Sequence, residues 1–178
     1  MDHPGSCLPY IGCGFSMNTI PIRVAAVKTP SKPSNGRSRK TLMVDFDGDL
    51  HPLSADIDQF CCKASSLAST IAGYDCEIVI SSSWRHHYNI QDILEFLPTS
   101  LRRSVVGTTG PSYIGKWPRY QEILNYCQVN GISDWRALDD ALLEFPSPCK
   151  ELILCNPNTG IDTKQLIALK QWLMHDHP

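Results

Sequence analysis

A pair of carboxylates two residues apart is the feature of this chain best suited to chemistry. Asp45 and Asp47 follow a mainly apolar run at 41–44, and Gly48 and Asp49 come next. Residues two apart on an extended strand point to the same side, so the first two carboxylates can face one small site. Two like charges held this close repel unless a cation or a shared proton offsets them. The pair therefore predicts a Mg²⁺ site or acid–base chemistry, as in phosphoryl transfer.

Three further segments carry polar groups suited to phosphate chemistry. Serines at 81–83 lead toward a predicted helix, where free backbone N–H groups favour an anion. Lys116 and Arg119 can each place positive charge near a transferring phosphoryl group. Asp139 and Asp140 form a second carboxylate pair, suited to a hard cation such as Mg²⁺. Each segment alone has an ordinary explanation as a turn, a helix cap or a solvated surface, but their order predicts a single site.

The elements that must position these groups alternate along the chain. Apolar runs predict strands at 41–46, 77–81, 104–108, 135–138 and 151–155. Apolar residues at three- and four-residue spacing predict helices at 55–72, 90–97, 119–130 and 163–175. The alternation predicts an α/β fold, a three-layer Rossmann-like sandwich with a mainly parallel five-stranded sheet. Ligands of such sheets bind beyond the carboxyl ends of the strands, which is where the polar groups occur.

Charge divides the chain into two parts. Its 178 residues, 42% of them apolar, suffice for one sizeable core plus a tail. Residues 1–40 are rich in Pro, Gly, Ser and Asn and hold six basic residues and one acid, a net charge of +5. The remainder holds ten basic and seventeen acidic residues, a net charge of −7. We predict a flexible basic leader at 1–40, with a short strand at 18–27 left open, and a folded domain at 41–178.

This charge distribution also bears on partners. A negative body with a cationic site is compatible with metal-dependent phosphate chemistry and unlike a general nucleic-acid binder. The leader is either an arm attracted to phosphates or a solvated tail.

The eight cysteines and the hydropathy pattern indicate a cytoplasmic protein. There is no CxxC pair and no zinc-type spacing, so reduced thiols are expected, with Cys76 and Cys155 as small core residues. No apolar stretch approaches the ~20 residues that span a bilayer, so no membrane association is predicted.

The ordered motifs resemble those of the haloacid dehalogenase (HAD) superfamily of aspartate-dependent phosphohydrolases. The first motif, Asp-x-Asp-Gly, matches at 45–49. The Leu-His-Pro that follows at 50–52 resembles a subgroup that includes HAD domains of RNA-repair proteins. The fourth motif matches at 139–140, and the resemblance covers about residues 41–175, which implies a HAD-like phosphohydrolase domain there.

The second and third motifs leave alternatives. The second matches at Ser82, which a Ser-Trp-Arg context favours, or at Ser81. The third resembles the subgroup pattern Arg-x-x-Glu-Ile at Arg119, whereas the superfamily more often has a lysine, for which Lys116 is the alternative. The resemblance implies that Ser82 and Arg119 hold the oxygens of the transferred phosphoryl group.

The resemblance also implies a mechanism. Asp45 would attack phosphorus to form an aspartyl-phosphate, and Asp47 would protonate the leaving oxygen and then deprotonate water. Mg²⁺ would be held by Asp45, the Asp47 main-chain carbonyl and Asp139, with Asp140 in support. Such a sequence divides one difficult displacement into two easier ones.

The spacing of the motifs indicates a capless domain. Only 36 residues separate Asp45 from Ser82, and 56 separate Ser82 from Asp139, so no substantial cap domain fits between them. An open site can take small phosphomonoesters or a macromolecule such as a nucleic-acid end. Three tryptophans beside the predicted loops either stack on a base or pack the sheet: Trp84, Trp117 and Trp135.

Two hypotheses follow. One is a Mg²⁺-dependent phosphomonoester hydrolase acting on nucleic-acid or nucleotide phosphates, with phosphotransfer as a variant. The other is a non-catalytic, phosphate- or partner-binding HAD-like domain.

Overall fold

Five parallel strands form one sheet at the centre of the molecule. The structure is a computed structural model that describes residues 39–175. The strands are β1 (Lys40–Val44), β2 (Cys76–Ile80), β3 (Val105–Thr108), β4 (Trp135–Asp139) and β5 (Leu152–Leu154). Their spatial order is β3-β2-β1-β4-β5, so the order reverses beside the central β1. The predicted α/β fold with a five-stranded parallel sheet is confirmed.

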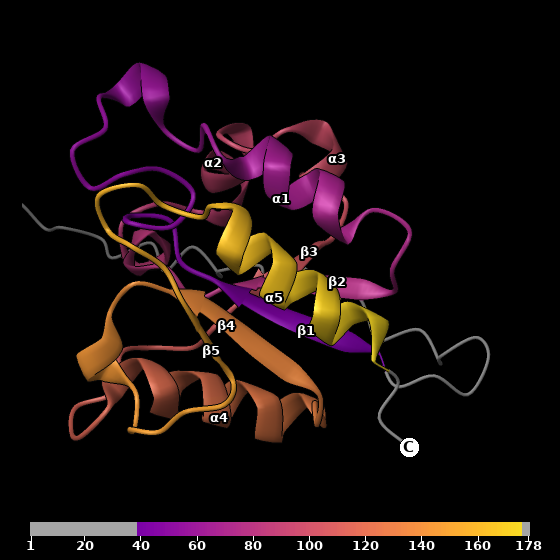
Figure 1. Ribbon diagram of the computed structural model, residues 1–178. Helices are drawn as coiled ribbons and strands as arrows, with labels where there is room; N and C mark the ends of the chain where they lie inside the picture. Colours follow the sequence, from indigo (N-terminus) through magenta and orange to yellow (C-terminus); the bar gives the residue numbers. More distant parts are fainter. Residues whose placement is uncertain (1–38, 176–178) are drawn as a thin grey trace, which may run out of the picture.

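Helices cover both faces of the sheet (Figure 1). One face carries α1 (Ala64–Ile71), α2 (Ile90–Glu95), α3 (Thr99–Arg102) and α5 (Thr163–Met174). The other carries α4 (Pro118–Asn130). Three single-turn 3₁₀ helices lie in the connections: η1 (Ile57–Gln59), η2 (Ser83–His86) and η3 (Leu142–Glu144).

Side-chain alternation along β1 divides the core in two. Leu42 and Val44 belong to the larger apolar cluster, under α1, α3 and α5. Met43 belongs to the smaller cluster, under α4. All five residues of β1 are buried, as expected for a central parallel strand covered on both faces. The same alternation directs the next residue, Asp45, toward α4.

The connection after β1 differs from the predicted one. A continuous helix over 55–72 is wrong in its first half, because residues 50–63 form a loop whose two ends are hydrogen-bonded to each other. Leu50 is fully buried, and its carbonyl accepts a hydrogen bond from the Lys63 N–H at 2.9 Å. Cys61 has a φ of 56°, a conformation that a helix cannot contain. Tertiary contacts therefore delay the helix until Ala64.

Three further predictions concern the start of the folded domain, the burial of two cysteines and the absence of membrane-spanning helices. β1 begins at Lys40, one residue before the predicted domain boundary, and the possible strand at 18–27 lies outside the described residues. Cys76 and Cys155 are buried, as predicted. Within residues 39–175, none of the helices has the length and apolar character needed to cross a membrane.

Candidate active site

The register of the sheet aligns three polar residues at its carboxyl edge. The last residue of β1 pairs with Ile80 on one side and with Leu138 on the other. Asp45, Ser81 and Asp139 come next on their strands and therefore lie in one row. Because registered residues of parallel strands point to the same side, all three side chains face α4.

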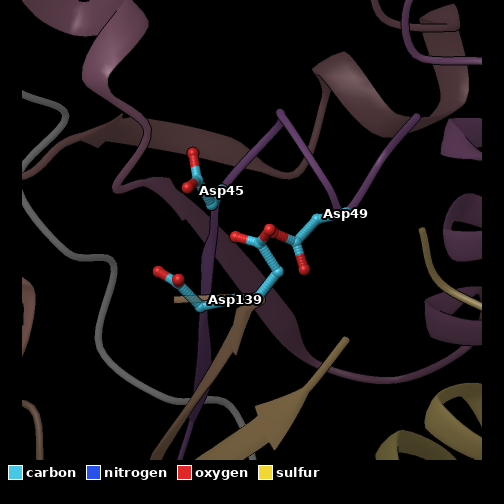
Figure 2. A group of neighbouring side chains, drawn as sticks. Asp45, Asp49 and Asp139 are labelled. Carbon is cyan, nitrogen blue, oxygen red and sulfur yellow. The ribbon is translucent and has the colours of Figure 1, made fainter. Parts of the chain in front are cut away.

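Four carboxylates converge at this edge. Asp45, Asp49, Asp139 and Asp140 each offer one oxygen, and these oxygens lie within 4.8 Å of one another. Figure 2 shows the first three of these residues gathered at the end of the sheet. Carboxylate oxygens so arranged are the ligands preferred by a hard divalent cation.

Several of these oxygens are buried without a hydrogen bond. Asp49 and Asp139 have no exposed surface, and Asp45 is 6% exposed. Neither oxygen of Asp49, nor Oδ2 of Asp139, takes part in a hydrogen bond. The remaining oxygen of Asp139 accepts a hydrogen bond from the Ala141 N–H at 2.9 Å. Buried carboxylate oxygens without partners are costly, so the cluster as it stands suits a bound cation.

Electrostatics agree with this assessment. Burial raises the pKa of Asp49 well above its ordinary value, and the charges of Asp139 and Asp45 raise it further. The Cys155 thiol opposes this shift weakly, although it does not reach Asp49 in hydrogen-bond geometry. Burial also raises the pKa of Asp139, against the effect of Arg119. The raised pKa values indicate that the positive charge near the carboxylates does not offset their burial and mutual repulsion.

Arg119, in the first turn of α4, is the cation that the structure brings to the cluster. Its Nη2 lies 3.2 Å from Asp45 Oδ2, and its Nη1 lies 3.5 Å from Asp139 Oδ2. Nη1 also donates to the Ser81 carbonyl at 2.5 Å. Burial alone lowers the pKa of Arg119, but the neighbouring carboxylates more than offset this and raise it. One guanidinium against four carboxylates leaves an excess of negative charge, which a divalent cation would offset.

A tight turn after β1 brings Asp49 into the cluster. The Asp49 N–H donates to the Phe46 carbonyl at 3.2 Å. Gly48 has a φ of +78°, and a Cβ there would lie 2.2 Å from Asp140 Oδ2. Glycine is needed both for the backbone angle and for this close approach. Sequence reasoning missed Asp49 as a member of this cluster, although the glycine before it is a turn signal.

Asp47 does not join the four carboxylates. The strand ends at Val44, so the expectation that Asp45 and Asp47 share a strand face does not hold. The Asp47 side chain is 41% exposed and is bonded to His51 and Trp84. The hydrogen bond from His51 is the largest of the effects that together lower the pKa of Asp47.

Comparison with known families agrees with this geometry. Residues 41–166 match the family model described as the HAD domain in Swiss Army Knife RNA repair proteins. The chain belongs to this family. Comparisons with curated proteins and with solved structures found no match. The matched range contains all four converging carboxylates and Arg119.

The HAD domain is capless in its described part. Between β1 and β2 lie only η1 and α1, and between β2 and β4 lie η2, α2, α3, β3 and α4. No further folded unit is inserted among residues 39–175 to cover the carboxyl edge, in agreement with the motif spacing.

The two alternative cations of the HAD domain lie in different surroundings. Arg119 is 8% exposed and contacts the carboxylates. Lys116 is exposed, and its ammonium lies over the Trp117 ring, 4.1 Å from the centroid. Only Arg119 is brought into the cluster.

The two alternative serines also differ. Ser82 Oγ accepts a hydrogen bond from the Trp84 N–H at 3.3 Å and caps η2. Ser81 Oγ is buried without a partner in the described structure, as is the hydroxyl of Thr109, the residue after β3. Ser81 follows β2 in register with Asp45, whereas Ser82 already belongs to the turn into η2. Thr109 was not among the residues predicted from the sequence.

A buried ion pair between Arg85 and Glu122 supports the loop that carries Ser81 and Ser82. Arg85 Nη2 lies 2.5 Å from Glu122 Oε2, and the two side chains are 4% and 7% exposed. Arg85 also donates to the carbonyls of Ser81 and Ser82, at 2.5 and 2.8 Å, and to that of Gly110 at 3.1 Å. The pair therefore ties α4 to the loops that follow β2 and β3.

The tryptophans mostly pack the fold. Trp135 is buried in the smaller apolar cluster, as the packing alternative predicted. Trp84 packs edge-on against Phe46 at 5.3 Å, and its indole N–H donates to Asp47.

Proposed function

We propose that this HAD domain is a Mg²⁺-dependent phosphomonoester hydrolase that acts through an aspartyl-phosphate on Asp45. The observation that carries the proposal is the convergence of four carboxylates within 4.8 Å at the carboxyl edge of the sheet. The fully buried oxygens of Asp49, which take part in no hydrogen bond, are a second indication of a cation site. Family membership supports the same activity, because HAD domains are typically phosphohydrolases.

The residues present fit the metal that the family implies. Asp45, Asp49, Asp139 and Asp140, with the main-chain carbonyl of Asp47, would supply the hard oxygen ligands that Mg²⁺ prefers. When bound, Mg²⁺ would offset the repulsion between an anionic nucleophile and an anionic substrate.

Asp45 and Asp47 divide the chemistry between them. A carboxylate oxygen of Asp45 attacks phosphorus, the bond from phosphorus to the leaving oxygen breaks, and Asp47 gives that oxygen its proton. In the second step the Asp47 carboxylate takes a proton from water as the water attacks phosphorus. The bond to Asp45 then breaks, inorganic phosphate leaves, and both side chains return to their starting states.

Ser81 and Arg119 would hold the transferred oxygens. Ser81 lies in register with Asp45 and has a free hydroxyl, whereas the Ser82 hydroxyl already caps η2. Ser81 is therefore the better candidate than Ser82, and Arg119 the better candidate than Lys116. In phosphoryl transfer most of the acceleration comes from such positioning and charge stabilisation.

The substrate class follows from the capless architecture and the family. A site without a cap accepts a large molecule, and the family description names RNA repair proteins. Phosphorylated ends of a nucleic acid, or nucleotides, are the proposed substrates, with cleavage confined to phosphomonoesters.

A non-catalytic, phosphate-binding domain is the second candidate. One observation favours it: the guanidinium of Arg119 pairs directly with Asp45, the proposed nucleophile. In that case the domain would bind phosphate without turning it over.

An assay of p-nitrophenyl phosphate with Mg²⁺ or with EDTA separates the candidates, followed by RNA oligonucleotides phosphorylated at the 5′ or the 3′ end. We expect Mg²⁺-dependent turnover that Asp45→Asn lowers by roughly 10³-fold or more, because the nucleophile is lost.

Asp75→Asn, at the opposite edge of the sheet beside Arg39, is the matched control and should retain full activity. Phosphate release by Asp45→Asn at the rate of the unchanged protein would refute the aspartyl-phosphate. Binding of phosphorylated RNA without turnover would establish the second candidate.

A further inference from the structure

The carboxylate of Asp47 is engaged on both oxygens. His51 Nε2 lies 3.1 Å from Oδ1, and Trp84 Nε1 donates to Oδ2 at 2.8 Å. The two donors reach Asp47 from different segments, the loop after β1 and η2, and so fix the plane of the carboxyl group. Each carboxylate oxygen has a second lone-pair site, so the group can still carry a proton.

The hydrogen bond to the other ring nitrogen determines the tautomer of His51. The backbone N–H of Cys61 donates to Nδ1 at 3.3 Å. A backbone N–H can only donate, so Nδ1 must be unprotonated, and the neutral ring then carries its hydrogen on Nε2. His51 is thereby a donor toward Asp47 without needing a positive charge.

Packing holds both rings in place. His51 is 1% exposed, and its ring lies 4.8 Å from that of Phe60 and 5.9 Å from that of Trp84. Trp84 also contacts Phe96 edge-on at 5.3 Å. Asp47, in contrast, is 41% exposed, so the supports are buried while the carboxyl group that they hold faces solvent. This arrangement suits a group that exchanges protons with substrate and water.

We propose that His51 and Trp84 are positioning residues that hold the Asp47 carboxyl group where it can give a proton to the leaving oxygen and take one from water. The inference rests on the proposed function and adds to it how the acid–base group is oriented. Both rings would act through their hydrogen bonds to Asp47 and not by contact with the reacting atoms. Loss of the donors should therefore slow the reaction most where the leaving oxygen needs a proton.

Two substrates test this dependence, p-nitrophenyl phosphate and propyl phosphate. The nitrophenolate leaves without a proton, whereas the propyl oxygen must receive one, and kcat/KM covers the steps up to the breaking of that bond. We expect His51→Phe, which keeps an aromatic ring, to lower kcat/KM for propyl phosphate by about 30-fold more than for p-nitrophenyl phosphate. Trp84→Phe should show the same selectivity, and His51→Gln, whose amide can donate to Asp47, should recover most of the loss.

Controls separate this inference from the proposed function. The exposed His87 provides the matched variant His87→Phe, which should affect both substrates equally. If Asp47→Asn shows the selective loss while both His51→Phe and Trp84→Phe lower the two rates equally, the inference is overturned and the function stands. If Asp47→Asn shows no selective loss, the proposed acid–base step falls and the inference with it.

A spectroscopic measurement on the full chain tests the tautomer without turnover. Nitrogen NMR of the ¹⁵N-labelled protein should show the His51 ring protonated on Nε2 and unprotonated on Nδ1. A ring protonated on Nδ1 would overturn the inference, even if a substitution at His51 prevents folding.

Discussion

The chemical state of Asp49 depends strongly on the site around it. It is fully buried, neither of its oxygens is hydrogen-bonded, and burial together with three other carboxylates raises its pKa. We propose that Asp49 serves as a metal ligand, because an ionised carboxylate buried without a hydrogen bond costs folding free energy.

Removing the charge of Asp49 should stabilise the metal-free protein but weaken its binding of Mg²⁺. Asp49→Asn should stabilise the metal-free protein by roughly 1–2 kcal/mol, since an unpaired buried charge is replaced by a neutral amide. The same change should weaken Mg²⁺ binding by about tenfold or more, because one ligand oxygen loses its charge. Thermal unfolding in EDTA and during a Mg²⁺ titration measures both effects. A variant that is less stable in EDTA and binds Mg²⁺ as before would contradict this account of Asp49.

At the scale of elements, α4 and the loops after β2 and β3 are joined through one ion pair. Arg85 and Glu122 are both buried, and a second oxygen of Glu122 accepts the Tyr113 N–H at 3.0 Å. The pair therefore stabilises the position of α4 against these loops. Several hydrogen bonds offset the cost of burying the two charges.

Breaking this pair should be expensive. We expect Glu122→Gln to destabilise the domain by about 3 kcal/mol, because Arg85 is left as an uncompensated buried charge. Adding Arg85→Gln should cost much less than the sum of the two single changes, and urea unfolding of the four proteins measures this coupling.

A surface pair provides the comparison. Lys150 lies 3.7 Å from Glu151 and is 85% exposed, so the same double-mutant cycle there should give less than about 1 kcal/mol of coupling. Equal coupling energies at the two pairs would show that burial does not strengthen the interaction between Arg85 and Glu122.

At the scale of the molecule, the site lies where the strand order reverses. β1 continues outward to β2 and β3 on one side, and the chain then returns to place β4 on the other. The crevice beside such a reversal is the usual ligand position of open parallel sheets. Here the crevice holds four carboxylates against the one guanidinium of Arg119, so we expect the stability of the fold to depend on a bound cation.

Metal binding should therefore be visible in unfolding. Mg²⁺ at about 100 times its Kd should add about 2.7 kcal/mol and raise Tm by roughly 5–10 °C for a domain of this size. Differential scanning calorimetry of the full chain checks this, with NaCl of equal ionic strength as the control. The prediction fails if NaCl produces the same shift, or if Asp139→Asn leaves the Mg²⁺ effect unchanged.

The features that could be read from the chain alone are those that depend on local pattern. Continuous apolar runs and helical spacing predicted the five strands and the parallel sheet, because both reflect burial on the faces of single elements. The motif order placed Asp45 and the Asp139–Asp140 pair at one edge for the same reason: each lies at the carboxyl end of a strand. Arg119 followed from the family pattern, and it lies beside Asp45.

Tertiary structure decided the rest, because the deciding contacts join residues distant in sequence or lie in turns that strand rules do not cover. A turn at Gly48, possible only without a side chain against Asp140, brings Asp49 into the cluster and leaves Asp47 outside it. The sheet register and the hydrogen bond of Ser82 within η2, rather than the Ser-Trp-Arg context, are the reasons for which we propose Ser81 over Ser82. The loop at 50–63 replaces the first half of a predicted helix, since the burial of Leu50, His51 and Cys61 near its two ends outweighs helical propensity.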